Sequence, residues 1–379
     1  MMADVPIPVS IPVSIADVSQ VSVGGTAAGA LANTRELARL ADDLGYHRYW
    51  VAEHHGDAAV VASCAPEVMI GHLAAVTRRL RVGSGAVLVN WMSPIRIVET
   101  YRVLESLHPG RIDLGLGRAD SPIPFVDIAL TLDRDAAAQR EAAGADPLAA
   151  MTSWLEHEER INEILSWQGG FSPNHPFSSI VIPDAGSGPQ PWLLGASVDS
   201  ALLAARLGMR FCYGAFINPR DAVSALGMYR NTFRPSPTGG SEPHSMLAIN
   251  LCCADTDPAA DRMRASVELF HRRAAEGSAR APLADPVEAI AELGAIPPPT
   301  PPSSLATGAW PLSFSGGPDR VHELVTSMVT TTGSDEVIIQ DLIAHHDNRL
   351  RSYELIADVF GLGETRCAAE WFALDNRPG

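Results

Sequence analysis

The sequence predicts a (β/α)8 barrel, an α/β fold in which eight parallel strands alternate with helices. Strand-like and helix-like segments alternate about every 30 residues, which is the size of one βαβ unit. Connections from helix to strand are short and those from strand to helix are long, and eight strand-like segments occur in all. This arrangement places the functional loops together at the carboxyl ends of the strands. A doubly wound open sheet is the alternative, and the number of strands favours the barrel.

The first third of the chain shows the repeat most clearly. Asn33 with Glu36 three residues later has the pattern of a capping box, and Gly45 is well placed to end that helix. Further helices are expected to begin at Pro66 and Pro94, because proline is favoured in a first helical turn. The predicted strands are residues 9–15, 46–52, 80–88, 111–116, 191–195, 210–215, 247–253 and 336–340.

We expect one barrel domain over residues 1–365, followed by a C-terminal tail, 366–379. Two insertions interrupt the repeat, at about 119–170 and 274–315. The second contains a proline run, 297–302, which favours extended polyproline conformation. Both insertions are expected on the C-terminal face of the strands, where lids form. The alternative is a disordered surface loop.

Composition excludes several classes of function. All 28 basic residues are arginine, so Schiff-base enzymes and P-loop proteins, which require lysine, are excluded. A net charge of −16 argues against nucleic acid as a partner. The sequence contains no apolar run long enough to span a membrane and no signal-peptide pattern at its start, and its five cysteines form no CxxC pair. We therefore expect a cytoplasmic protein without a metal site.

The segment YHRYWVAEHH, residues 46–55, is a strand that ends in an acid and two imidazoles. In a barrel, such a strand end is where catalytic groups are usually placed. A neutral imidazole can donate or accept a proton at working pH, and on extended backbone only one of His54 and His55 faces the barrel interior. The alternative is structural hydrogen bonding by both.

Three glycine-containing segments are candidates for ligand contact. Glycine within the strand at 83–86 marks close approach either by a flat ligand or by packing. Arg118, after the strand ending in GLG, would hold a phosphate at the barrel mouth or form a surface salt bridge. Ser197 and Ser200 follow the strand ending in Gly195, where a helix N-terminus and two hydroxyls would bind an anion. Ordinary helix capping explains them equally well.

Longer segments carry a family resemblance. The runs LANTRELARLADDLGYHRYWVAEHH, APEVMIGHLAA, RLRVGSGAVL and LHPGRIDLGLGRAD resemble the bacterial luciferase-like flavin monooxygenase family. The segments PWLLGAS, LAARLGM, FSGGPDRVHEL and NRLRSYELIADVF are similar to the same family, so the likeness spans most of the chain.

The resemblance implies an enzyme, a two-component monooxygenase that takes reduced FMN from a separate NAD(P)H-dependent reductase. In that family, O2 adds to the flavin C4a to form a peroxyflavin, which oxygenates the substrate. His54 matches the active-site histidine. Gly85 and Ala86 match the pair joined by a cis peptide beneath the flavin ring. A homodimer through the early helices is also implied.

The same resemblance assigns the remaining cofactor contacts. Arg118 matches the arginine that contacts the FMN phosphate, and Ser197 and Ser200 match the phosphate hydroxyls. Ala196 lies where backbone meets the flavin ring. The residues and the resemblance therefore point to the same FMN site, with Glu53 and His55 as scaffold.

This chain departs from the family after its third predicted strand. It has Asn90, Trp91 and Met92 where similar members have a Pro-Asn-His turn. The more apolar mouth suggests a bulky or aromatic substrate. The lysine-free, arginine-rich composition would suit a GC-rich actinobacterial genome, where enzymes of the resembled family often tailor polyketides, so natural-product tailoring, as in antibiotic biosynthesis, is expected by association. Two other functions stay open, a deazaflavin-dependent oxidoreductase on the same barrel and a non-catalytic flavin-binding protein.

Overall fold

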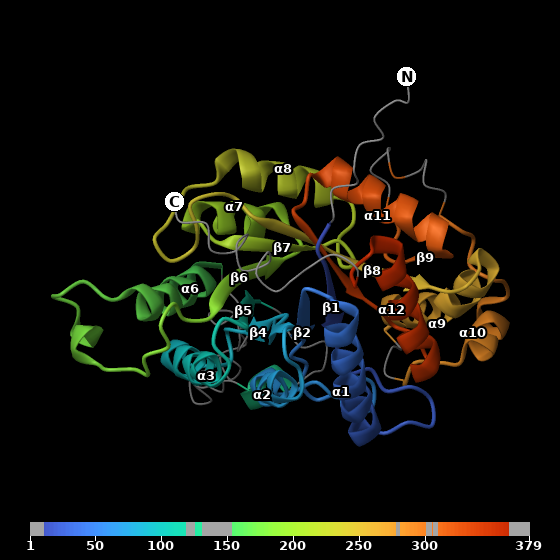
Figure 1. The fold of residues 1–379 in the computed structure, drawn as a ribbon, viewed down its shortest axis with the longest axis horizontal. Helices are drawn as coiled ribbons and strands as arrows, with labels where there is room; N and C mark the ends of the chain where they lie inside the picture. The colour runs from blue at the N-terminus through green and yellow to red at the C-terminus, as the bar shows by residue number, and fades with distance from the viewer. Residues whose placement is uncertain are drawn as a thin grey trace, which may run out of the picture.

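Segments rich in Val, Ile, Tyr and Trp alternate with amphipathic helices along this chain, and in the computed structural model they close into a parallel barrel (Figure 1). The structure describes residues 11–118, 126–130, 154–277, 281–300, 305 and 310–363. The expected tail, much of the first insertion and part of the proline run lie outside these residues. The predicted (β/α)8 fold is confirmed.

Eight strands form the ring in the order β1-β2-β3-β5-β6-β7-β8-β10, and β10 closes it by pairing with both β1 and β8. Two short strands join this ring, β4 beside β5 and β9 beside β8. The strands are β1 Val13–Asp17, β2 Arg48–Val51, β3 Arg81–Ser84, β4 Val87–Leu88, β5 Ile112–Gly117, β6 Gln190–Gly195, β7 Arg210–Gly214, β8 Ser245–Cys253, β9 Phe314–Gly316 and β10 Glu336–Gln340.

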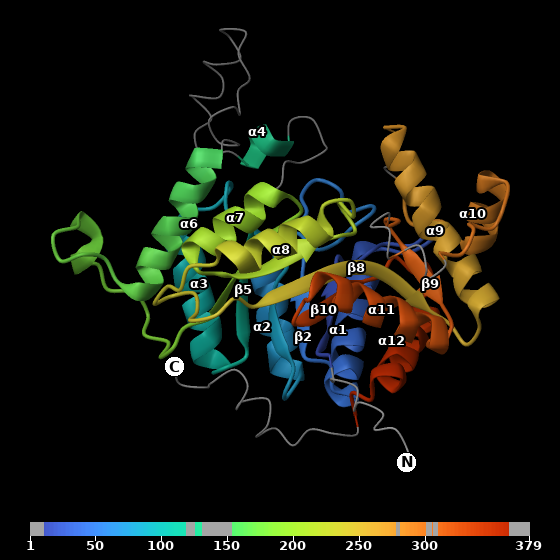
Figure 2. The ribbon, with the colours of Figure 1, turned by 90° about the horizontal axis from the view of Figure 1, so that it is seen from above.

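Helices cover the outside of the ring. Figures 1 and 2 show α6 on one side of the barrel and the α9–α10 pair on the other. The helices are α1 Ala27–Leu44, α2 Pro66–Val76, α3 Pro94–Leu107, α4 Val126–Leu130, α6 Trp154–Gly169, α7 Val198–Leu207, α8 Ala222–Thr232, α9 Asp257–Ala275, α10 Pro286–Leu293, α11 Pro318–Thr332 and α12 His346–Phe360, with a short 3-10 helix at Pro176–Ser179.

Strand alternation produces two apolar cores. Outward-facing side chains and the helices form a large ring-shaped core. Inward-facing side chains form a smaller core inside the barrel, made of Trp50, Trp192, Cys212, Met246, Ala248 and Ile338. Both tryptophans are at most 1% exposed and meet edge to face, with ring centroids 5.3 Å apart. The barrel interior is therefore filled with side chains rather than open along its length.

The first helix begins earlier than the capping box predicts. Its N-cap is Thr26, whose hydroxyl accepts from the N–H of Gly29, and Asn33 lies inside the helix. The predicted end at Gly45 is correct, because this residue adopts the left-handed conformation that glycine favours. The predicted helix start at Asn33 is wrong. Thr26 caps the helix instead, and the residues between Thr26 and Asn33 are also helical.

The strand predicted over residues 80–88 is two strands, β3 and β4, joined through Gly85 and Ala86. The second predicted insertion also contains regular structure. It includes α10, and it returns to the barrel through β9, which pairs with the end of β8 from Leu251 to Cys253. Together with α11, these elements were not predicted. Residues 296–300 have no regular secondary structure.

Among the described residues, no helix is both long and apolar enough to cross a membrane. The same part of the chain has no group of three or more His, Cys, Asp or Glu side chains arranged to hold a metal ion. Its four cysteines are free thiols, and only Cys64 is exposed.

Candidate active site

Four strand ends bring the predicted site residues to one end of the barrel, which we call the mouth. His54 follows β2, and Gly85 and Ala86 join β3 to β4. Arg118 directly follows β5, and Ser197 follows β6. Because the strands are all parallel, these positions share the side to which the strands' carboxyl ends point. The structure therefore gathers the predicted residues where a barrel binds its ligands.

His54 lies on an extended segment beyond β2. Its backbone N–H donates to the carbonyl of Ser63 at 2.8 Å, which fixes the segment against the following loop. The side chain is exposed, yet desolvation by the surrounding protein lowers its pKa, while the Glu53 carboxylate opposes that shift. His54 is therefore neutral near pH 7 and accessible to a ligand.

Glu53 and His55 serve as scaffold beside His54. The carboxylate of Glu53 is buried and accepts from the N–H of Leu88 at 2.8 Å. Its other oxygen lies 2.8 Å from His55 Nε2. The contact with Leu88 ties the end of β2 to β4. The contact with Glu53 holds the His55 side chain, so His54 rather than His55 is the candidate proton-transfer group.

A cis peptide bond joins Gly85 to Ala86, as the resemblance implies. The glycines nearby are explained by close packing of the barrel wall. A Cβ atom on Gly85 would lie 3.1 Å from the Cβ of Trp50, and one on Gly115 would lie 2.0 Å from the carbonyl oxygen of Ser84. Packing therefore accounts for the glycines, and flavin contact at Gly85 and Ala86 stays a prediction.

Arg118 is half-buried and lies against the first turn of α6. Its guanidinium is 4.4 Å from the centroid of the Trp154 ring, close enough for a cation–π interaction. His157, one turn along α6, meets the same tryptophan edge to face at 5.7 Å. Burial and the Arg118 charge lower the pKa of His157 to about 4. Helix α6, which begins inside the first predicted insertion, thus supports the predicted phosphate ligand.

Ser197 and Ser200 form a reciprocal cap at the start of α7. The Ser200 N–H donates to Ser197 Oγ at 3.2 Å, and the Ser197 N–H donates to Ser200 Oγ at 3.2 Å. Ser200 Oγ also donates to the Ser197 carbonyl at 2.7 Å. Ser200 is buried and packs where a Cβ on Gly195 would otherwise lie. The capping explanation is therefore correct for both, and phosphate contact stays a prediction.

Ala196 lies between the β6 end and α7, with its carbonyl facing residues that the sequence did not single out. That carbonyl accepts from Asn218 Nδ2 at 3.1 Å and from the Tyr213 hydroxyl at 3.3 Å. Asn218 also donates to Asp221 at 2.9 Å. This network fixes the backbone at the β6 end. No sequence motif marks Asn218, which follows β7 in an irregular segment.

Asn90, Trp91 and Met92 lie just beyond β4, and all three side chains are largely covered by protein. Trp91 is 7% exposed, and its indole N–H has no hydrogen-bond partner in the described part of the chain. Asn90 is fully buried, and neither polar atom of its side chain has a partner there. Met92 is half-buried against the large outer core. Unpaired buried polar atoms are costly, so Asn90 and Trp91 are candidates for ligand or water contact.

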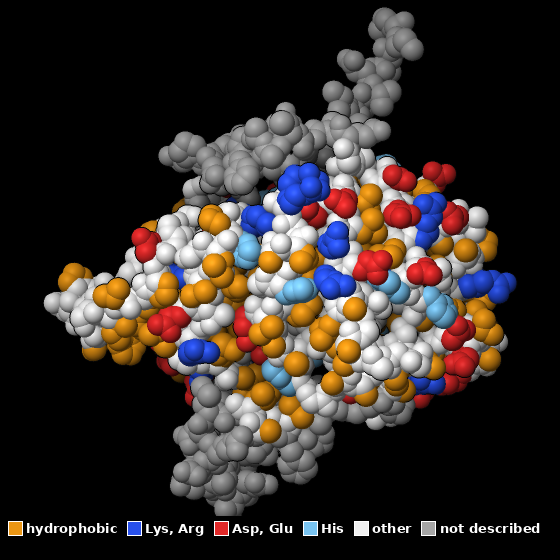
Figure 3. All heavy atoms as spheres, turned by 60° about the horizontal axis from the view of Figure 1, so that its bottom comes forward, with side chains coloured by type: hydrophobic (Ala, Val, Ile, Leu, Met, Phe, Trp, Pro, Cys, Tyr) orange, Lys and Arg blue, Asp and Glu red, His pale blue; other side chains and the backbone are white. Residues whose placement is uncertain are grey.

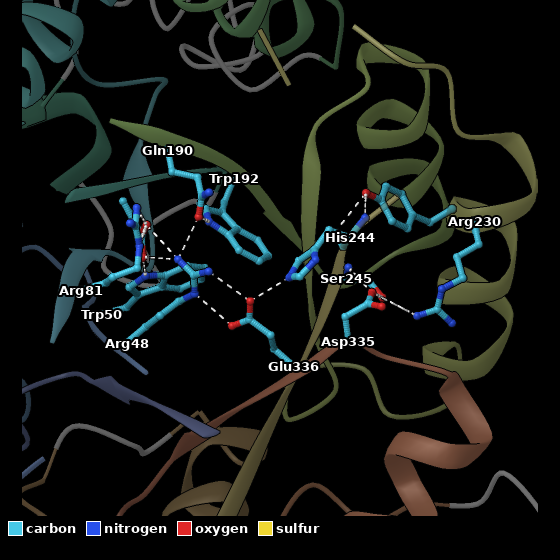
Figure 4. Close-up of polar contacts among 12 residues, drawn as sticks. Arg48, Trp50, Arg81, Gln190, Trp192, Arg230, His244, Ser245, Asp335 and Glu336 are labelled. Atoms are coloured by element: carbon cyan, nitrogen blue, oxygen red, sulfur yellow. Dashed lines mark hydrogen bonds and ion pairs between the residues drawn. The ribbon is translucent and has the colours of Figure 1, made fainter. Parts of the chain in front are cut away.

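A charged cluster fills the barrel end opposite the mouth, and the sequence did not reveal it (Figure 4). Arg48 is fully buried and forms ion pairs with Asp113 and Glu336, each at 2.9 Å. His244 lies 2.7 Å from Glu336, and Trp50 Nε1 donates to Asp113 at 2.9 Å. Burial raises the pKa of both carboxyl groups, but the neighbouring cations outweigh it and hold both below their usual values.

Comparison with known proteins links this arrangement to one family. Residues 11–331 match the family described as luciferase-like monooxygenase. A luciferase-like monooxygenase of Escherichia coli (strain K12) is 33% identical, covering 91% of this chain and 96% of its own. An N-acetyl-S-alkylcysteine monooxygenase of Bacillus subtilis (strain 168) is 31% identical, covering 91% and 97%. The crystal structure of apo-MsnO8 has a TM-score of 0.79 at 38% identity, covering 93% of this chain and 99% of that one.

Proposed function

Because this chain belongs to the luciferase-like monooxygenase family, we propose that it uses reduced FMN and O2 to oxygenate a small organic molecule. One observation carries this proposal. The same barrel mouth holds an accessible neutral imidazole at His54, a guanidinium at Arg118 and the N-terminus of α7 capped by Ser197. These are a proton-transfer group and two elements that bind an anion.

The mouth fits a cofactor that is flat and carries a phosphate. A guanidinium and a helix N-terminus are the usual protein partners of phosphate, and Arg118 and Ser197 follow adjacent strands, β5 and β6. The indole N–H of Trp91 and the side-chain amide of Asn90 add polar atoms that no group in the described residues satisfies. In this proposal Gly85 and Ala86 lie against the ring, and Ala196 contributes backbone to it.

The protein's own residues then have defined roles. Reduced flavin, when bound, supplies the electrons that activate O2. Arg118, Ser197 and Ser200 hold and orient the phosphate, and the apolar barrel floor excludes water from the reacting region. His54 receives or returns a proton at an imidazole nitrogen, which its lowered pKa keeps unprotonated near neutral pH.

We propose that the substrate is bulky or aromatic, because Trp91 and Met92 make this segment more apolar than the Pro-Asn-His turn of similar family members, even though both side chains are largely covered by protein. A role in natural-product tailoring belongs to the same proposal. A separate NAD(P)H-dependent reductase would supply the reduced FMN. In support of this, no segment of the sequence has the G-x-G-x-x-G spacing of a dinucleotide-binding turn.

We further propose that the protein is a homodimer through α2 and α3, which pack against each other. Figure 3 turns the side bearing α1, α2 and α3 toward the viewer and shows apolar side chains among charged ones. On these two helices Val68 and Leu107 are each 66% exposed, and Val103 is 47% exposed. Exposed apolar side chains on adjacent helices favour burial against a second copy.

Oxygen uptake by the purified protein tests the proposed function. The protein is mixed with chemically reduced FMN, with and without candidate aromatic and thioether substrates, and products are identified by mass spectrometry. Substrate-dependent oxygen incorporation from labelled O2 is the expected result. Preferential binding of a deazaflavin without oxygen uptake would identify a hydride-transferring enzyme instead. Tight FMN binding with no product from any substrate would favour a flavin-binding protein.

A further inference from the structure

Asn250, in β8, lies on the inner face of the barrel wall. Met246 and Ala248 of the same strand belong to the interior core, and side chains alternate along a strand, so Asn250 faces inward one step nearer the mouth. Its register partner is Gln340 of β10, which lies two residues beyond the interior residue Ile338. The two amide side chains are therefore neighbours on the inner face, next to each other across the strand pair.

The neighbours of β8 change beside Asn250. Strand β7 pairs with β8 only as far as Ala248, while β10 continues to Asn250 and β9 begins pairing at Leu251. The barrel side chains below are almost completely buried, but Ala16, Leu194 and Phe216, which pack on this interior core from above, are only half-buried. The floor beneath the mouth is thus apolar, with Asn250 at its edge.

The side chain of Asn250 is 3% exposed, and its Nδ2 has no hydrogen-bond partner in the part of the chain that the structure describes. Buried polar groups are nearly always paired, because leaving one unpaired destabilises the folded state. An unpaired amide at the edge of an apolar floor has the arrangement of a ligand-orienting group.

The position of Asn250 on the ring separates it from the predicted flavin contacts. Gly85 follows β3, and β8 is four strands from β3 in either direction around the barrel. Arg118 and Ser197 follow β5 and β6, which are three and two strands from β8 around the ring. If the cofactor is held by residues that follow β3, β5 and β6, the β8–β10 wall is left to contact a molecule bound on the other side of the cofactor.

We propose that Asn250, with Gln340 beside it, binds a neutral acceptor oxygen of the organic substrate, such as a ketone, ester or amide carbonyl. This inference rests on the proposed function, because it presumes a substrate bound beside the flavin. A carboxylate would be buried on the apolar floor without a cation to offset its charge, so an uncharged carbonyl fits these neutral amides better. The floor receives the remainder of the molecule, and the two amides set which end of it points to the β8–β10 wall.

A matched pair of probes tests this assignment. Acetophenone and α-methylstyrene have the same shape, but only the first has an acceptor oxygen. Their dissociation constants are measured by ligand-observed NMR titration against the FMN-loaded protein. We expect the wild-type protein to bind acetophenone about fivefold more tightly, as one net hydrogen bond allows. Asn250→Leu should abolish that preference, and the isosteric Asn250→Asp serves the same purpose if the leucine variant does not fold.

Ser266→Ala is the control, because Ser266 is also buried and its hydroxyl also has no partner among the described residues, but it lies on α9. It should retain the wild-type preference. In the ligand-free protein, Asn250→Leu should raise the midpoint of thermal unfolding, since it removes an unpaired buried amide. Equal binding of both probes, binding of neither, or a preference that survives Asn250→Leu would overturn the proposal.

FMN affinity, measured by flavin fluorescence, separates this inference from the proposed function. Asn250→Leu should leave FMN affinity unchanged. A loss of FMN affinity in this variant would place Asn250 against the cofactor and overturn the substrate assignment. If the wild-type protein does not bind FMN, the proposed function itself fails. If FMN binds and only the probe preference is missing, the function stands and the role of Asn250 does not.

Discussion

The guanidinium of Arg118 stacks over the ring of Trp154, 4.4 Å from its centroid. This contact joins the end of β5 to the start of α6, a helix that belongs to the first insertion. Arginine side chains have many rotamers, so a group that must meet a phosphate benefits from being held in one orientation. Trp154 therefore positions Arg118, although it is itself 40% exposed.

Replacing Trp154 should weaken FMN binding only by weakening the contact of Arg118 with the phosphate. Trp154→Leu removes the cation–π contact, worth about 0.5–2 kcal/mol, and FMN affinity should fall by about 3- to 30-fold. Riboflavin lacks the phosphate, so its affinity should not change. Both dissociation constants are measured by quenching of flavin fluorescence.

The neighbouring exposed residue supplies the control for that experiment. Leu155 is 69% exposed on the same turn, and Leu155→Ala should bind both flavins normally. Trp154→Phe retains an aromatic face and should restore most of the affinity. If FMN and riboflavin lose affinity equally in Trp154→Leu, the positioning role is wrong and α6 is only a structural support.

His54 should produce an acid limb in the pH dependence of oxygenation. Desolvation lowers its pKa below 6.5, so the imidazole stays neutral over the physiological range and becomes charged only at lower pH. We expect kcat/KM to fall as pH decreases through an apparent pKa below 6.5, and His54→Asn to lose both most of the activity and this limb.

FMN affinity should persist in His54→Asn, because the residue is not predicted to hold the phosphate. His55→Gln is the matched control, since that imidazole contacts Glu53. It should keep the acid limb. An acid limb that remains unchanged in His54→Asn would exclude His54 as the titrating group.

The charged cluster should make the barrel sensitive to acid. Arg48 and the other cations hold the pKa of Glu336 well below its usual 4.5 in the folded protein. The unfolded chain therefore binds this proton first, so the stabilisation is complete above about pH 5.5 and decreases as pH falls below 4.5. Glu336→Gln should lower the free energy of unfolding by about 3 kcal/mol at pH 7, because it leaves a buried guanidinium without one partner.

Urea unfolding at pH 7 and pH 4 measures this effect. The difference between wild type and Glu336→Gln should narrow at the lower pH, where the wild-type carboxylate begins to lose its contribution. Glu292→Gln removes a carboxylate from an exposed pair with Arg273 and should have little effect at either pH. A constant difference between wild type and Glu336→Gln at both pH values would contradict the linkage.

If two copies associate through α2 and α3, a charged residue introduced on these helices should lower the molar mass of the protein in solution. Leu107→Arg introduces a charge at an exposed apolar position on α3, and light scattering should show the molar mass fall from that of two chains to that of one. Val287→Arg, at a position 76% exposed on α10, is the control and should leave the mass unchanged. A wild-type protein that is monomeric at micromolar concentration would reject the proposed dimer.

Periodic segments made the barrel predictable from sequence. Each ring strand contains alternating or continuous apolar residues, and parallel topology then places every strand end on the same side without further information. Features without a local pattern were not predictable. The break between β3 and β4 falls at Gly85 and Ala86 within an apolar run, and the early start of α1 at Thr26 competes with an equally good cap at Asn33.

The charged cluster shows a second limit. In the segment RYWV, Arg48 has the spacing of a residue on a strand face, and nothing local tells which face is buried. Its partners Asp113 and Glu336 lie 65 and 288 residues away and become neighbours only when the ring closes. Asn250 shows the same limit. A single amide in an apolar strand points to a ligand only once the structure shows that the described residues provide no hydrogen-bond partner for it.

The two ends of this barrel differ in how ligands could reach its interior. Arg48 and its partners, with Trp50 and Trp192 above them, close the end opposite the mouth. Under the proposed function, flavin and substrate would therefore enter and leave through the mouth. A molecule bound beneath the flavin would have to enter before it and leave after it. The closed barrel end would thus set an order of binding without a dedicated residue at the mouth.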